Sequence, residues 1–112
     1  KETSEEITRM LVNVVDKALR NGTAKIPGYS VAAKTGTAQM TEEGKVGGYV
    51  EGKYLHSFFG YFPAYQPKFL VFLFHIYPKN VQYASETLTD PFLNITKFLI
   101  NYYQIPPDRP EN

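Results

Sequence analysis

The chain has 112 residues, of which 43% are hydrophobic and 21% are charged, and its formal net charge at pH 7 is +1. This length predicts one small domain, and the composition excludes a disordered, collagen-like or low-complexity chain. Because no basic run or stripe is present, nucleic acid is a poor candidate partner. The sequence contains no cysteine, which excludes a disulfide framework, a cysteine zinc site and a cysteine nucleophile.

The N-terminal segment has the pattern of an amphipathic helix. Thr3 followed by Glu6 fits a capping box, so we expect Thr3 to be the N-cap. Asn21 and Gly22 supply a left-handed stop at the other end. Apolar residues recur between these signals with a 3.6-residue period and form one face; they are Ile7, Met10, Leu11, Val14, Val15, Ala18 and Leu19.

Three antiparallel strands are predicted to follow, over residues 29–38, 54–62 and 68–77. Residues 40–52 have the polar, glycine-rich composition of a long loop, and residues 63–67 form a short hairpin connection. Alternation in the first strand places Lys34 and Gly36 on one side and Thr35 and Thr37 on the other. The other two strands are apolar on both faces, which predicts a sheet covered on two sides with their aromatic residues in the core.

A second helix is predicted to begin with Asp90 as N-cap and Pro91 as the first helical residue. We expect it to end before residues 105–107, and we expect the tail 108–112 to be frayed. Its apolar stripe consists of Phe92, Ile95, Leu99 and Tyr102, with Phe98 beside it. The order helix, three-stranded antiparallel sheet and C-terminal helix predicts an α+β fold.

Residues 26–39 hold the side chains best suited to chemistry. They read Ile-Pro-Gly-Tyr-Ser-Val-Ala-Ala-Lys-Thr-Gly-Thr-Ala-Gln. The ammonium of Lys34 and the hydroxyls of Thr35 and Thr37 could bind a carboxylate, and Gly36 lets a ligand approach the backbone. A strand edge also offers N–H groups that can hold an oxyanion. A Lys-Thr-Gly triplet alone is more often an ordinary solvated strand end, so the longer match matters.

The whole stretch resembles the third signature motif of the penicillin-binding proteins and serine β-lactamases. Its extended form, with Thr-Ala-Gln after the glycine, is similar to that of the class B penicillin-binding proteins, which are peptidoglycan D,D-transpeptidases. Residues 14–24 resemble the family's helix before the motif strand, residues 56–64 its Ser-Phe-x-Gly strand, and residues 105–108 the tail after its last helix. The resemblance therefore covers essentially the whole chain.

The resemblance implies a role for each motif residue. Lys34 would face the cleft and help relay protons, while Thr35 and Thr37 would bind the carboxylate of a β-lactam or a stem peptide. The backbone N–H of Thr37 would form half of the oxyanion hole, and Gly36 would keep the strand surface clear for the acyl group. Lys34 and Thr37 are thus the catalytic candidates, and no metal or cofactor is implied. Because Lys34 and the threonines alternate across the strand, the ligand has to bind along the strand edge or at a local twist.

The family's nucleophile motif, Ser-x-x-Lys, is not found in this sequence, and neither is its second motif, Ser-x-Asn. Both precede the third motif in the family, so we expect residues 1–112 to be the C-terminal portion of a transpeptidase domain without its front part. Without a nucleophile the chain alone is expected to be inactive. An open edge on the last strand predicts self-association. The serines that fail both patterns are Ser4, Ser30, Ser57 and Ser85.

Two functions remain open at this stage. The first is part of a membrane-anchored D,D-transpeptidase on the extracytoplasmic face of the bacterial cytoplasmic membrane. Its partners would be the peptidoglycan stem peptide or its lipid-linked precursor, β-lactams, and the missing front of the same domain. The second is a non-catalytic binding or sensor module with the same fold. A class D β-lactamase fits less well, because the Thr-Ala-Gln extension argues against it.

The remaining polar candidates have simpler explanations. His56 and His75 lie within apolar strands, so we expect core or edge histidines rather than members of a serine triad with Asp16 or Asp90, or of a metal site. The acidic residues of the loop are expected to be solvated, and they could border the cleft and influence substrate choice; they are Glu42, Glu43 and Glu51.

Overall fold

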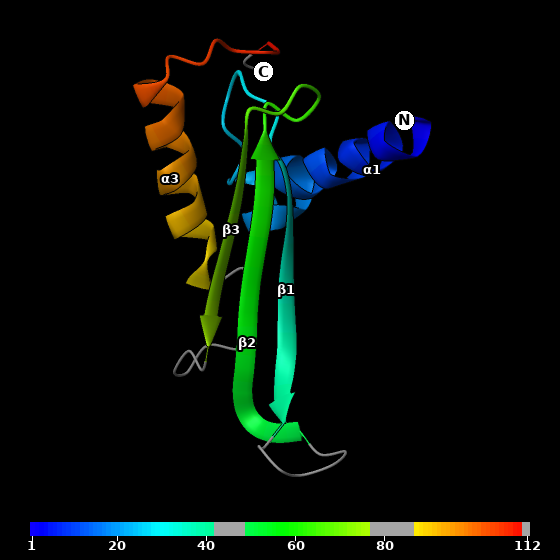
Figure 1. The fold of residues 1–112 in the computed structure, drawn as a ribbon, viewed down its shortest axis with the longest axis vertical. Helices are drawn as coiled ribbons and strands as arrows, with labels where there is room; N and C mark the ends of the chain where they lie inside the picture. The colour runs from blue at the N-terminus through cyan, green and yellow to red at the C-terminus, as the bar shows by residue number, and fades with distance from the viewer. Residues whose placement is uncertain (42–48, 77–86, 111–112) are drawn as a thin grey trace.

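The computed structural model describes residues 1–41, 49–76 and 87–110, and Figure 1 shows their arrangement. Helix α1 (Glu2–Asn13) continues into a π-helical turn (Val14–Ala18) and a 3-10 turn (Leu19–Gly22). Strands β1 (Ala32–Thr41), β2 (Tyr49–Phe62) and β3 (Phe69–Ile76) follow, and helix α3 (Thr89–Tyr102) completes the order. The predicted α+β order is confirmed. Within the described ranges no helix is both long enough and apolar enough to span a bilayer.

The three strands form one antiparallel sheet in the order β1-β2-β3. Strand β1 begins at Ala32, three residues later than predicted, because Tyr29 and Ser30 bond to the C-terminal tail instead of to a strand. Strand pairing also extends beyond the predicted ends, since Thr41 pairs with Tyr49. Backbone pairing therefore continues into the polar segment that composition assigned to a loop.

Helix α3 packs on one face of the sheet through Phe92, which is 1% exposed. Its ring lies 4.5 Å, centroid to centroid, from the ring of Phe58 on β2. The ring occupies space that Gly60 leaves open, because a Cβ at Gly60 would lie 2.3 Å from Cζ of Phe92. These contacts join both elements in one core.

The stripe predicted for this helix is right for Phe92 and Leu99, which join the core, and wrong for Phe98 and Tyr102, and the predicted N-cap is wrong. Phe98 is 63% exposed and Tyr102 is 68% exposed, whereas Thr96 and Ile100 are buried together with Phe92 at a four-residue spacing. The helix begins at Thr89 with Leu88 as N-cap, and Asp90 forms an ion pair with Arg20 instead of a cap. The sheet thus contacts a face of the helix rotated from the most apolar one.

Helix α1 covers only one end of the opposite sheet face (Figure 1). Val12 packs on Ala32 and Ala64, and the Thr8 hydroxyl lies 2.7 Å from the Tyr61 hydroxyl. The prediction that both faces are covered is therefore wrong for the described residues. On β3, four large side chains of this face are 49–70% exposed; they are Leu70, Phe72, Phe74 and Ile76.

Two details of the first helix also differ from the sequence prediction. The helix begins at Glu2 with Lys1 as N-cap and without a side-chain capping bond, so Thr3 is not the cap. Ile7 and Met10 are exposed, because the helix contacts the sheet with a different side, the one that carries Thr8 and Val12. The predicted stop is confirmed, since Asn21 and Gly22 have φ angles of 56° and 86°.

The tail that the sequence predicted to be frayed is anchored up to Arg109. The guanidinium of Arg109 donates two hydrogen bonds of 2.7 Å to the carboxylate of Asp16, and this hydrogen bonding raises the pKa of Arg109 above its ordinary value. The carboxylate of Asp108 accepts the backbone N–H of Ser30 at 2.8 Å and also its hydroxyl. The Tyr29 hydroxyl donates to the carbonyl of Ile105 at 2.8 Å. The tail therefore holds the segment that leads into β1.

Replacing Arg109 with alanine in the full protein is expected to lower the free energy of unfolding by about 1.5–3 kcal/mol, because two charge-assisted bonds are lost and a partly buried carboxylate remains. Arg109→Lys should give an intermediate loss, since lysine cannot form the paired bonds. Urea denaturation measures both. The control is Arg9→Ala, whose exposed pair with Glu6 should contribute less than about 1 kcal/mol. Equal losses at Arg9 and Arg109 would contradict the assigned anchor.

Candidate functional site

The Lys-Thr-Gly-Thr sequence lies in the middle of β1. Its register with β2 pairs Lys34 with Phe59, Thr35 with Phe58, Gly36 with Ser57 and Thr37 with His56. Directly paired residues share a sheet face, so Thr35 and Thr37 lie on the face of Phe58, toward α3. Lys34 and Gly36 lie on the opposite face, which confirms the alternation predicted from the sequence.

The motif follows a buried stretch of the chain. Val31, Ala32 and Ala33 are almost fully buried, whereas Lys34 and Thr37 are exposed. Ser30 fixes the start of this stretch, because its hydroxyl and carbonyl each accept the N–H of Ala64 at 3.0 Å. A rigid, buried start therefore presents an exposed motif, as a binding strand requires.

The motif strand is at the edge of the sheet. Among the described residues β1 pairs with β2 alone, so alternate N–H and C=O groups of its other edge face away from the sheet. The ammonium of Lys34 donates to the carbonyl of Thr35 at 2.8 Å. No described carboxylate forms an ion pair with Lys34. This edge thus brings together one cation, two hydroxyls and strand N–H groups, a set that can bind an anionic ligand.

The structure shows a local reason for a glycine at position 36 that the sequence did not show. A Cβ at this position would lie 2.5 Å from Oγ of Ser57 on the neighbouring strand. Ser57 therefore lies against the motif, on the same face as Lys34. The position of the Ser57 hydroxyl over Gly36 therefore depends on the absence of a side chain at Gly36.

The alternative triads are not assembled in the described part of the chain. Asp16 binds Arg109, and Asp90 pairs with Arg20. His56 is fully buried, with its Nδ1 lying 2.7 Å from the Thr87 hydroxyl, and His75 is exposed. Ser85, Glu42 and Glu43 and the side chain of Glu51 lie outside the described residues.

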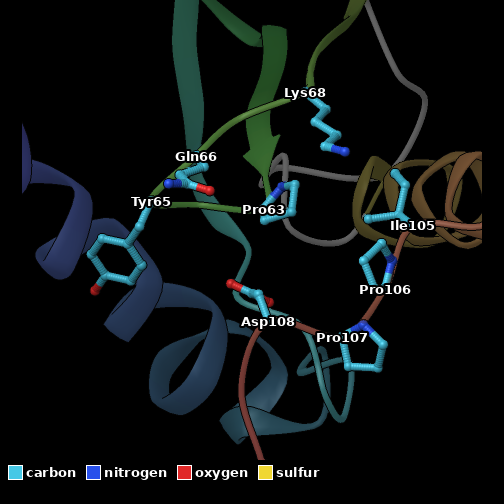
Figure 2. A pocket seen from close by; sticks show the side chains of 8 residues that line it. All are labelled: Pro63, Tyr65, Gln66, Lys68, Ile105, Pro106, Pro107 and Asp108. Atoms are coloured by element: carbon cyan, nitrogen blue, oxygen red, sulfur yellow. The ribbon is translucent and has the colours of Figure 1, made fainter.

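One hollow of 420 Å³ lies at the end of the sheet where β1 begins. Figure 2 shows it between the β2–β3 connection and the C-terminal tail. Asp108, at its rim, binds Ser30, which is four residues before Lys34, a distance of about 13 Å along an extended chain. The hollow is therefore separate from the motif; its lining is Pro63, Tyr65, Gln66, Lys68, Ile105, Pro106, Pro107 and Asp108.

Known proteins match both the sequence and the fold. A peptidoglycan D,D-transpeptidase FtsI homolog of Nephroselmis olivacea is 32% identical over 112 residues, which are 98% of this chain and 16% of that protein. The transpeptidase domain of penicillin-binding protein 3 from Burkholderia pseudomallei superposes with a TM-score of 0.75 at 30% identity, covering 97% of this chain and 32% of that one.

Penicillin-binding protein 3 of Mycobacterium tuberculosis, solved with ampicillin, superposes with a TM-score of 0.74 at 28% identity, and the match covers 98% of this chain and 27% of that one. This chain thus spans less than a third of each solved relative. The family profile described as the penicillin-binding protein transpeptidase domain matches residues 1–97. These 112 residues therefore belong to the penicillin-binding protein transpeptidase family.

Proposed function

We propose that this chain is part of a peptidoglycan D,D-transpeptidase that cross-links stem peptides by serine acyl transfer. It would form the side of the active-site cleft that carries the Lys-Thr-Gly motif. The observation that carries the proposal is the position of Lys34 to Thr37 on the open edge of β1, in a chain of the transpeptidase family. The edge offers positive charge and hydroxyls for a substrate carboxylate, and N–H groups for the oxygen of the attacked carbonyl.

Each motif residue has one task in this proposal. The Lys34 ammonium sets a positive potential on its face of the strand and helps move the proton that leaves the nucleophile. Thr35 and Thr37 bind the carboxylate of the stem peptide or of a β-lactam through their hydroxyls. The N–H of Thr37 donates to the oxyanion that forms when a serine attacks the carbonyl. Gly36 lets the acyl group lie close to the strand.

The nucleophile has to come from outside these 112 residues. We infer that residues 1–112 are the C-terminal portion of the transpeptidase domain, because the sequence holds neither Ser-x-x-Lys nor Ser-x-Asn. Alone, the chain then has no covalent route for acyl transfer. The front of the same domain is its first partner, and the open faces of β1 and β3 are where it would pack.

The proposed setting is the cell envelope, where the peptidoglycan stem peptide or its lipid-linked precursor is the substrate. The relatives named as peptidoglycan D,D-transpeptidases support this setting. The parent protein would act on the extracytoplasmic face of the cytoplasmic membrane. Binding of β-lactams is proposed by analogy with the Mycobacterium tuberculosis protein solved with ampicillin and with aztreonam.

Intact-mass analysis of the full protein after exposure to a penicillin tests the proposal. A single adduct, mapped to the serine of an upstream Ser-x-x-Lys motif, is expected for the enzyme. A folded protein that forms no adduct would contradict acyl transfer and favour a non-catalytic binding module, in which Lys34 to Thr37 hold a ligand without chemistry. The names of the relatives favour the enzyme.

Replacing Gly36 with alanine in the full protein is expected to slow acylation by a penicillin by a factor of about 10–100, because a misplaced site geometry has effects of this size. The new methyl group meets Oγ of Ser57 on one side and the proposed acyl position on the other. Adding Ser57→Gly separates the two causes. We expect the double variant to stay slow, and full recovery of its acylation rate would assign Gly36 to strand packing alone.

The 112-residue chain by itself is expected to self-associate through its open sheet face or the edge of β3. Phe72 and Phe74 are more than half exposed on that face, and such apolar patches mark interaction surfaces. Light scattering after size exclusion should therefore give a mass above 12.8 kDa. Phe72→Glu together with Phe74→Glu should shift the chain toward the monomer. A clean monomer before substitution would contradict the prediction.

A further inference from the structure

One buried histidine lies directly beside Thr37 of the motif and has no task in the proposed reaction. His56 is 0% exposed, and it is the register partner of Thr37 on β1. It shares the sheet face of Phe58, two residues further along β2, which contacts α3 through Phe92. The imidazole thus lies between Tyr54 and Phe58 on this face of β2, with its ring centroid 6.3 Å from that of Tyr54.

The imidazole has a directional bond that a hydrocarbon side chain could not form. Its Nδ1 lies 2.7 Å from the hydroxyl of Thr87, which is two residues before α3 begins at Thr89. A polar ring inside a protein is costly unless it is hydrogen-bonded, so this bond compensates for burial and also fixes a distance. It joins β2, at the level of Thr37, to the segment that leads into α3.

We propose that His56 is a positioning residue: it holds Thr37 where its hydroxyl can bind the carboxylate of the substrate. Below, this binding of the carboxylate is called the carboxylate grip. The bond to Thr87 holds β2 at a fixed distance from the start of α3, and strand pairing transmits that position from His56 to Thr37. The side chains of paired residues lie about 4.5–5.5 Å apart between their Cβ atoms, so a shift of His56 moves Thr37 directly. The inference rests on the proposed function, because it assigns a support to that same site.

The test removes the bond from the Thr87 side, where burial is only partial. Thr87→Val in the full protein keeps the shape and deletes the hydroxyl, whereas Thr87→Ser keeps the hydroxyl. Acylation rates are measured with a penicillin and with the methyl ester of its carboxylate. We expect Thr87→Val to reduce the preference for the free acid over the ester by about five- to tenfold, the effect of one hydrogen bond. Thr87→Ser should keep the preference within about twofold.

A matched control deletes another threonine hydroxyl near the same core. Oγ1 of Thr96 is buried in α3 and has no hydrogen-bond partner among the described residues. Thr96→Val should therefore leave the acid-to-ester preference unchanged. The same bond can be tested by replacing its other partner, His56. His56→Asn keeps a hydrogen-bonding atom near the position of Nδ1, so it should preserve more of the acid-to-ester preference than His56→Leu.

The acid-to-ester ratio does not depend on how much of the protein is folded, so a purely structural role of Thr87 would not change it. An unchanged ratio in Thr87→Val, or an equal loss in Thr87→Ser, overturns the inference while leaving the proposed function intact. A wild-type protein that is not acylated, or that shows no preference for the acid, overturns both the carboxylate grip and its support.

Discussion

Replacing Lys34 with alanine in the full protein is expected to lower the second-order rate constant of acylation by a penicillin by a factor of about 10²–10⁴. The residue is the exposed cation of the motif face, and no described carboxylate neutralises it. Its loss removes both the positive potential on that face of the strand and a group that can move the nucleophile's proton. Stopped-flow measurement with a chromogenic β-lactam gives the rate constant.

The control for this substitution is Lys97→Ala, which removes an exposed lysine from α3. It changes the net charge by the same amount and should change the rate constant by less than about twofold, because exposed charges at a distance are screened by salt. Lys34→Arg keeps the charge but replaces a compact ammonium with a planar guanidinium, so we expect partial activity. Acylation of the Lys34→Ala protein at the wild-type rate would contradict the proposed role of Lys34.

The sequence predicted which sheet face each residue of β1 lies on better than it predicted where the strand begins. Period-two alternation placed Lys34 and Thr35 on opposite faces, and the register confirms it, because alternation is a property of every extended strand. The start of β1 was wrong by three residues. Its cause is the bond from the backbone of Ser30 to Asp108, a residue 78 positions away. Contacts of such long range leave no local signal.

The face of α3 was predicted only in part, because apolar residues lie on two sides of this helix. Phe98 and Tyr102 stack on each other outside the core, with ring centroids 5.7 Å apart. Thr96, a polar residue, is buried instead. The choice between the two faces is made by β2, where the missing side chain of Gly60 leaves room for a ring. Helical periodicity cannot reveal the shape of the surface that the helix will meet.

The sequence could predict the candidate site only as far as one continuous segment of the chain contains it. The motif from Lys34 to Thr37 lies together on β1 because neighbours in a strand stay neighbours. Its neighbours come from other parts of the chain: Ser57 lies beside Gly36, and His56, the proposed support of Thr37, is bonded to Thr87. A histidine that positions a site residue and a histidine that only fills the core look the same in a sequence. Only the register with β1 shows that His56 lies beside Thr37.

Replacing Phe92 with alanine is expected to lower the free energy of unfolding by about 3–5 kcal/mol, the range for large-to-small changes of a buried phenylalanine. The ring is 1% exposed, contacts Phe58 and lies against Gly60, where no side chain can move in to fill the space. The cavity should therefore persist rather than collapse. Urea denaturation of the full protein gives the free energy, followed by the fluorescence of its aromatic residues.

The matched control for this prediction is Phe98→Ala, on the same helix. Its ring is 63% exposed, so the change should cost less than about 1 kcal/mol. Helix propensity cannot explain a difference between the two variants, because both replace phenylalanine with alanine inside α3. If Phe98→Ala were the more destabilising variant, α3 would contact the sheet through the side of Phe98, and the packing of Phe92 against Gly60 would be wrong.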